Sequence, residues 1–221
     1  GNDGSVKLWD ARQKAQNRAT SVIRGHKGGV TAFATRDARG GAVGSILTGD
    51  ESGVVRAWDP KHAAAGPVAL AHAHMGKVTA IAPLQRSDMT ASAGKDCVIR
   101  VLRLDGERGG DISLCGHLSD ITSLAVLQDD TKGREPIGSL VSGSDDGYIR
   151  VWSGGEVVND VREPWRCVSN TRAHIGAVSC MTTDAGTAKR SSVLIFKSNE
   201  SAKDAANKVL LSASVDHSFA S

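Results

Sequence analysis

The sequence lacks long apolar segments, and neither sign of charge is in marked excess. No apolar run approaches the roughly 20 residues that a helix needs to span a bilayer, and no secretory signal is visible at the N-terminus. The chain has 27 Lys and Arg against 24 Asp and Glu, a net charge of +3. That balance is too even for the field of the chain to attract nucleic acid or an anionic membrane surface. We therefore expect neither nucleic-acid binding nor membrane insertion, and predict an intracellular protein, cytoplasmic or nuclear.

Motifs of catalytic and metal chemistry are also missing. The sequence contains no G-x-S-x-G, no P-loop and no H-E-x-x-H. His72 and His74 form an H-x-H pair, but no third ligand lies at a recognisable spacing. The cysteines form no CxxC pair, and we interpret them as buried, reduced thiols; they are Cys97, Cys115, Cys167 and Cys180. We predict a protein that is not an enzyme and needs no cofactor, and keep a catalytic or metal-binding protein as the weaker alternative.

What the sequence does contain is an internal repeat. The string GSDDGYIRVW at 143–152 returns in degraded form as GNDGSVKLWD at 1–10, DESGVVRAWD at 50–59, AGKDCVIRVL at 93–102 and ASVDHSFAS at 213–221. A histidine lies upstream of each copy after the first, at His26, His74, His117 and His174. Short β-branched, alternating segments such as VTAF at 30–33 follow these histidines and are separated by Gly, Asp and Ser turns, a pattern typical of strands. Self-similarity at a regular spacing predicts a repeat architecture.

These strings resemble the Gly-His and Trp-Asp signatures of WD40 repeats. The resemblance covers nearly the whole chain and implies an all-β fold, a β-propeller built of four-stranded antiparallel blades. It implies four to five blades here, as part of a seven-bladed propeller, because the sequence begins and ends inside a repeat. The expected divisions are the end of blade one at 1–24, blade two at 25–71, blade three at 72–115, blade four at 116–169, and blade five at 170–221 with an insertion at 183–208.

The resemblance also implies a buried tetrad in each blade. Its members are a Trp on the third strand, a Ser or Thr on the second, a His before the first, and an Asp in the turn between the second and third. A closed network of buried polar groups rigidifies a blade, whereas a half-closed one costs stability. Blade two has Ser52 at the Asp position, and blade three has Leu102 at the Trp position. By spacing, only blade four carries all four members, which are His117, Ser142, Asp146 and Trp152.

We interpret the protein as a non-catalytic scaffold that binds other proteins within a larger multiprotein assembly. Partners of this family most often bind the top face, which is built by the turns between second and third strands and the connections into first strands. The residue before each turn Asp position and the residue after each His are expected there, and their mixture of charges and apolar groups suits a protein surface. They are Lys27, Glu51, Met75, Lys95, Leu118, Asp145, Ile175 and Val215.

One short motif suggests a more specific alternative. The segment Trp9-Asp10-Ala11-Arg12 resembles the WDxR box of WD40 substrate receptors, which dock on the propeller-built adaptor of cullin-4 ubiquitin ligases. Arg12 would then be the residue that contacts the adaptor. Because Trp-Asp ends many WD40 repeats, the general scaffold remains our principal interpretation.

Overall fold

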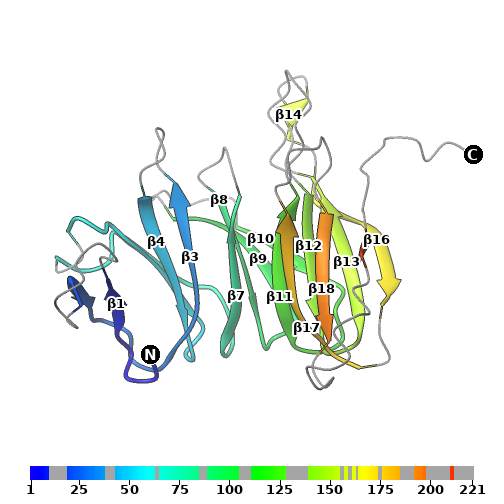
Figure 1. The fold of residues 1–221 in the computed structure, drawn as a ribbon. Coiled ribbons are helices and arrows are strands. Elements are labelled where there is room, and N and C mark those ends of the chain that lie inside the picture. Colours follow the sequence, from blue (N-terminus) through cyan, green and yellow to red (C-terminus); the bar gives the residue numbers. More distant parts are fainter. Residues whose placement is uncertain are drawn as a thin grey trace, which may run out of the picture.

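Every regular element in the described part of the chain is a β-strand (Figure 1). The computed structural model describes residues 1–9, 19–37, 43–62, 65–84, 89–104, 111–127, 139–154, 157–158, 161–162, 164–173, 176–184, 192–197 and 210–211. All pairs of neighbouring strands within the sheets are antiparallel. The all-β class expected from the repeat is therefore confirmed.

Three four-stranded sheets form the body of the molecule, and in each the strands are neighbours in chain order. The first sheet contains β3 (Val30–Asp37), β4 (Val43–Asp50), β5 (Val54–Trp58) and β6 (Ala69–His72). The second contains β7 (Val78–Pro83), β8 (Met89–Gly94), β9 (Val98–Arg103) and β10 (Ile112–Cys115). The third contains β11 (Ile121–Leu127), β12 (Ser139–Ser144), β13 (Tyr148–Ser153) and β16 (Arg166–Arg172).

Smaller sheets flank this body. They are formed by β1 (Val6–Leu8) with β2 (Ser21–Ile23), by β17 (Val178–Asp184) with β18 (Ser192–Lys197) and β19 (Leu210–Leu211), and by the hairpin of β14 (Val157–Val158) and β15 (Val161–Arg162). The sequence places Val193–Phe196 in an insertion at 183–208, but the structure makes these residues part of β18, which pairs with β17 from Asp184 to Val178. The run of β-branched and aromatic residues favours a strand, so this apolar segment lies within the sheet.

The sheets stand side by side, and each packs on the next through its first two strands (Figure 1). The first strands β3, β7, β11 and β17 are neighbours in that order, and β4, β8 and β12 contact the first strand of the following sheet. Every residue of β8 and of β12 is buried. The apolar clusters lie between sheets: Leu47 and Val55 of the first sheet, for example, pack with Ile81 of the second. Burial between sheets, rather than within one sheet, thus supplies the core.

A threonine hydroxyl links each of the three complete sheets to the following one. Thr31 Oγ1 on β3 donates to the carbonyl of Val78 at 2.5 Å. Thr79 and Thr122, at the same position of β7 and β11, donate in the same way to the carbonyls of Ile121 and Val178. These hydrogen bonds fix the position of each first strand, along the strand axis, relative to the first strand of the next sheet. An apolar contact alone does not do this.

The cysteines correct one expectation. Cys97 is partly buried, and Cys115 and Cys167 are exposed rather than buried; all three are free thiols. Cys115 lies on β10 and Cys167 on β16, the last strands of their sheets, where one edge and much of the surface face water. The side chain of Cys180 lies outside the described part. Among the described residues there is no helix of the length and apolarity that crossing a membrane requires.

Candidate functional site

Four side chains of the third sheet form a continuous chain of hydrogen bonds. The indole N–H of Trp152 donates to the Ser142 hydroxyl at 2.8 Å, and that hydroxyl lies 2.6 Å from His117 Nε2. His117 Nδ1 faces Asp146 Oδ2 at 3.4 Å. Arg150 Nη1 also contacts His117 Nδ1, so this ring nitrogen faces both a guanidinium donor and the Asp146 carboxylate. The structure thus brings together His117, Ser142, Asp146 and Trp152.

The first sheet carries an equally complete network, which the sequence spacing did not predict. Trp58 Nε1 donates to Thr48 Oγ1 at 2.7 Å, Thr48 Oγ1 lies 2.9 Å from His26 Nε2, and His26 Nδ1 lies 2.9 Å from Asp50 Oδ2. Asp50 therefore takes the place of the expected Asp at position 52. The carboxylate reaches the histidine from the end of β4, and its second oxygen accepts from the amide and the hydroxyl of Ser52.

The second sheet has a shortened network. His74 contacts Ser92 Oγ through Nε2 and Asp96 Oδ1 through Nδ1, each at 2.9 Å. Leu102, which stands where the Trp would be, is fully buried in the cluster with Leu47 and Val55. The leucine replaces the packing of an indole but offers no N–H to the Ser92 hydroxyl.

Arginines on the third strands are a part of these networks that sequence reasoning missed. Arg56 donates to Asp50 Oδ2, and Arg150 donates to Asp146 Oδ2 at 3.0 Å. Each lies two residues before the Trp, and a basic residue occupies that position in four copies of the repeat, a signal that was available in the sequence. Arg100, in the second sheet, instead donates to Ser113 Oγ at 3.0 Å.

Burial sets the protonation state of these groups. Burial and the nearby charge of Arg150 lower the pKa of His117 to about 4. Burial likewise lowers the pKa of His26 and of His74, although their hydrogen bonds to carboxylates oppose the change. Burial alone would raise the pKa of Asp146, but hydrogen bonds from two backbone amides and Arg150 outweigh it and lower that pKa to about 2. At neutral pH the imidazoles are therefore neutral and Asp146 is ionised.

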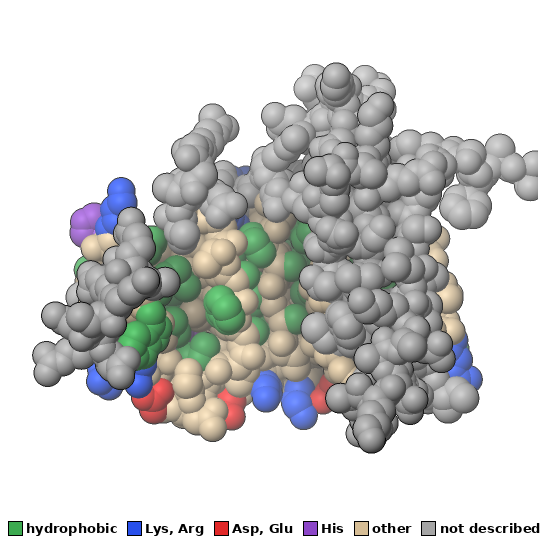
Figure 2. Space-filling view, viewed as in Figure 1, with side chains coloured by type: hydrophobic (Ala, Val, Ile, Leu, Met, Phe, Trp, Pro, Cys, Tyr) green, Lys and Arg blue, Asp and Glu red, His purple; other side chains and the backbone are tan. Residues whose placement is uncertain are grey.

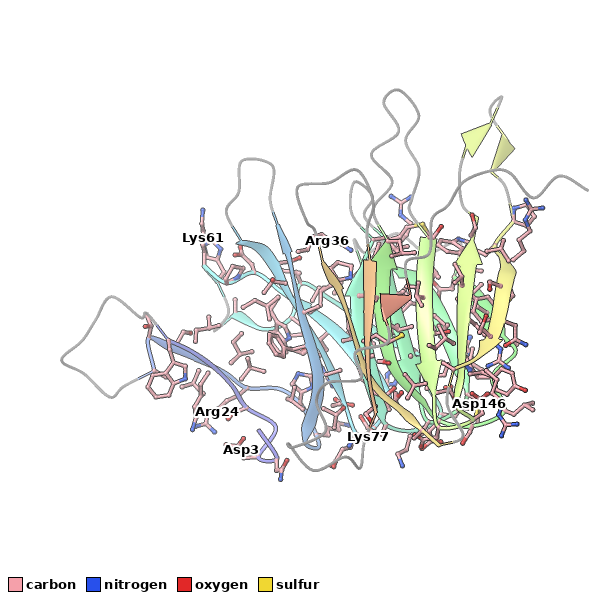
Figure 3. The ribbon with its side chains drawn as sticks, turned by 45° about the vertical axis from the view of Figure 1, so that its right-hand side comes forward. Asp3, Arg24, Arg36, Lys61, Lys77 and Asp146 are labelled. Carbon is pink, nitrogen blue, oxygen red and sulfur yellow. The ribbon has the colours of Figure 1, made fainter. Side chains whose placement is uncertain are left out.

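The candidate binding residues lie at one end of the sheets, which we call the turn face. It is formed by the turns between second and third strands and by the connections that precede the first strands. Figure 3 labels Asp3, Lys77 and Asp146 along this edge and Lys61 at the opposite edge, and charged groups of both signs line the same edge in Figure 2. Six candidates fall in the described part, and all are exposed: Lys27, Glu51, Met75, Lys95, Leu118 and Asp145.

The aspartates of the buried networks also hold the backbone of the turn face. The amides of Met75 and Leu118 donate to Asp96 Oδ2 and Asp146 Oδ2, each at 3.2 Å. Their side chains point into solvent, with 92% and 87% of their surface exposed. A rigid backbone therefore presents two large apolar side chains at equivalent positions of adjacent sheets.

The remaining candidates divide between those the structure places elsewhere and those outside the described part. His72 is exposed on β6 while His74 is buried, so the H-x-H pair does not converge. Within the described residues no group of three His, Cys, Asp or Glu side chains is arranged to hold a metal ion. Trp9 is 61% exposed. Ile175, Val215 and Arg12 lie outside the described part, so the ligase-adaptor contact stays a prediction.

The comparisons with known proteins agree with this geometry. Residues 112–153 match the family model "WD domain, G-beta repeat", and this segment holds β10 to β13 with the whole His117–Trp152 network. This segment is therefore a WD40 repeat. The four-stranded sheets of the chain are WD40-type blades. We number β3–β6 as blade two, β7–β10 as blade three, and β11–β13 with β16 as blade four. The finer division of the chain at the expected residue boundaries stays a prediction.

Two crystal structures of computationally designed proteins resemble this chain. Ika8 gives a TM-score of 0.59 at 21% identity, over 88% of this chain and 50% of the designed one. Ika4 gives a TM-score of 0.58 at 21% identity, over 81% of this chain and 91% of the designed one. The chain thus spans half the length of Ika8, and at this identity the likeness concerns the fold alone. No curated protein sequence matches it.

Proposed function

We propose that this WD40 protein is an interaction scaffold whose turn face binds another protein within a larger multiprotein assembly. One observation carries the proposal. Met75 and Leu118 are almost fully exposed at equivalent positions of blades three and four, while partly buried aspartates fix their backbone. Large apolar side chains that remain exposed on a rigid frame gain most from being covered by a partner.

The polar groups around these two residues also favour a protein partner. Glu51 accepts a hydrogen bond from the amide of Gly29 at 3.1 Å, and Lys95 pairs with Asp120 of the next blade at 3.1 Å. Asp145 adds a further exposed carboxylate. A surface that mixes both charge signs around apolar groups complements a protein better than it complements a uniformly negative phosphate backbone. WD40 repeats generally mediate protein–protein interaction.

The test is quantitative affinity purification from cells that express the protein natively. We expect the double variant Met75→Ser and Leu118→Ser to lose specific co-purifying proteins by about tenfold or more, because hot-spot truncation commonly costs more than about 1.4 kcal/mol. The triple variant Glu51→Ala, Lys95→Ala and Asp145→Ala should weaken the same partners.

The matched control removes two equally apolar, exposed side chains away from the turn face. Val68 is 63% exposed and Leu70, on β6, is 55% exposed. Val68→Ser with Leu70→Ser should leave every partner in place, and all variants should keep the unfolding midpoint of the parent. Retention of all partners by the turn-face variants would refute the proposed site.

A further inference from the structure

The turn face carries the charges of blades three and four in an ordered arrangement. In blade three Lys95 lies beside Lys77, because the amide of Lys95 donates to the carbonyl of Lys77 at 3.0 Å. The same backbone hydrogen bond, also 3.0 Å long, joins Asp145 to Asp120 in blade four. All four strands of both blades are described. Blade three therefore presents two cations at the positions where blade four presents two anions.

One ion pair crosses the boundary between these two blades. Lys95 Nζ lies 3.1 Å from Asp120 Oδ2, and this pair neutralises the two inner charges. Within the described part of the chain neither Lys77 nor Asp145 has an ion-pair partner. Figure 3 labels Lys77 on this edge, and Figure 2 shows basic groups flanked by acidic ones along it. Across the two blades the turn face thus runs from an unpaired cation to an unpaired anion.

The neighbouring blades explain why the two outer charges stay unpaired. The ion pair joins the turn residue of one blade to the residue that precedes the first strand of the next. By the same rule Glu51 of blade two would face Lys77, but a carboxylate oxygen of Glu51 accepts from the amide of Gly29 in its own blade at 3.1 Å. On the other side, the residue that precedes β17 is Ala177, which offers no cation to Asp145.

The apolar side chains of the turn face follow the same arrangement. Met75 in blade three and Leu118 in blade four occupy equivalent positions and are 92% and 87% exposed. A twofold axis that lies in the plane of this face and passes between the two blades would place blade three of one copy on blade four of another. Lys77 would then meet Asp145 of the second copy, and Met75 would meet Leu118. The patch is therefore complementary to itself, as a symmetric dimer interface requires.

We propose that the partner of the turn face is a second copy of this chain, bound face to face through blades three and four. The inference rests on the proposed function, since it requires the turn face to be a protein-binding surface. The apolar contact between Met75 and Leu118 supplies the affinity. The two symmetric pairs of Lys77 with Asp145 fix the orientation of the copies, because any other alignment leaves like charges opposite each other.

Sedimentation equilibrium of the 221-residue chain tests the proposal. We expect a monomer–dimer equilibrium with a dissociation constant on the order of micromolar, as is usual for a small interface. Lys77→Glu and Asp145→Lys should each raise that constant about tenfold or more, because symmetry places each reversed charge opposite a like charge twice. The matched control is Lys61→Glu at the opposite edge, which changes the net charge of the chain as Lys77→Glu does and should dimerise like the parent.

Two combinations of these variants test the twofold pairing itself. The double variant Lys77→Glu with Asp145→Lys should dimerise like the parent, because the reversed charges again face opposite ones. An equimolar mixture of the two single variants should form heterodimers with nearly the affinity of the parent, although neither variant dimerises well alone. Met75→Ser with Leu118→Ser should also raise the dissociation constant about tenfold or more. All variants should keep the unfolding midpoint of the parent.

The outcomes separate this inference from the proposed function. Dimers that Lys77→Glu and Lys61→Glu form equally well would place the contact outside the turn face and overturn the inference. A chain that stays monomeric, while Met75→Ser with Leu118→Ser loses co-purifying proteins, would assign the turn face to a different protein. In that case the proposed function stands and the second copy fails. Failure of the proposed function is seen separately, as retention of every co-purifying protein by the turn-face variants.

Discussion

Asp50 Oδ2 lies 2.9 Å from His26 Nδ1 and also accepts from Arg56, so one buried carboxylate joins the second strand, the third strand and the entry of blade two. The side chain of Asp50 is fully buried. Hydrogen bonds from Ser52, His26 and Arg56 outweigh the burial that would raise its pKa, and hold that pKa well below the usual range. Blade two therefore depends on a charge that has no contact with water.

Asp50→Ala should destabilise the protein strongly. The substitution leaves Arg56 buried without its carboxylate and removes the acidic partner of His26 Nδ1, and uncompensated buried partners cost about 3 kcal/mol or more. The free energy of unfolding from urea titration at pH 7 measures the effect. Ser52→Ala is the control, because it removes only a turn hydroxyl and should cost no more than about 1 kcal/mol. Equal losses in the two variants would show that the carboxylate does not hold the network.

Stability should fall as the pH is lowered from about 6.5 towards 4. The pKa of His117 is about 4 in the folded protein against 6.5 for a free imidazole, so between these values the unfolded chain binds the proton and the folded chain does not. Unfolding is then favoured by acid, and the full difference corresponds to at most about 3 kcal/mol. The lowered pKa of His26 and His74 acts in the same direction. Urea midpoints at pH 7.5, 6 and 5 measure the slope.

The control for this pH dependence is His117→Asn, which has no titrating ring. Asp146, whose pKa is about 2, stays ionised throughout this range and does not contribute. The variant should be less stable than the parent at pH 7.5 but should lose less stability between pH 7.5 and 5. Parallel slopes in parent and variant would mean that His117 is not the group that titrates.

The threonine links between blades should contribute measurably. Thr79→Val keeps the shape of the side chain but removes the hydroxyl that donates to the carbonyls of Ala93 and Ile121. A carbonyl left without its donor costs about 1–2 kcal/mol. Thr79→Ser keeps the hydroxyl and should lose less than half as much. Chemical denaturation measures the free energy of unfolding of both variants. Equal values for Thr79→Val and Thr79→Ser would show that apolar packing alone, and not the hydroxyl, links blades three and four.

The comparison of sequence with structure shows which features a repeat encodes. Short antiparallel strands separated by tight turns recur through the three complete blades, as the repeat predicts, because turn glycines and β-branched runs mark their ends. Asp50 escaped prediction because a carboxylate two residues before the usual turn position reaches the same histidine, which spacing alone does not reveal. The exposure of Phe33 also escaped, because it depends on what lies beside β3 and not on the residues of β3 themselves.

Cys97 occupies a turn position that suits glycine, and replacing it should stabilise blade three. Its φ is +62°, while Gly4, Gly53 and Gly147 hold the equivalent positions with φ between +70° and +83°. A side chain in this left-handed region costs about 1 kcal/mol, part of which the greater freedom of glycine in the unfolded chain offsets. Cys97→Gly should therefore raise the free energy of unfolding by up to about 1 kcal/mol.

The converse substitution is Gly53→Ala, whose added Cβ would lie 2.0 Å from the carbonyl oxygen of His74. The chain must shift to accept it, so this variant should lose at least about 2 kcal/mol. Urea titration of both proteins tests the pair, and a Cys97→Gly protein less stable than the parent would show that the thiol side chain contributes more than its backbone conformation costs.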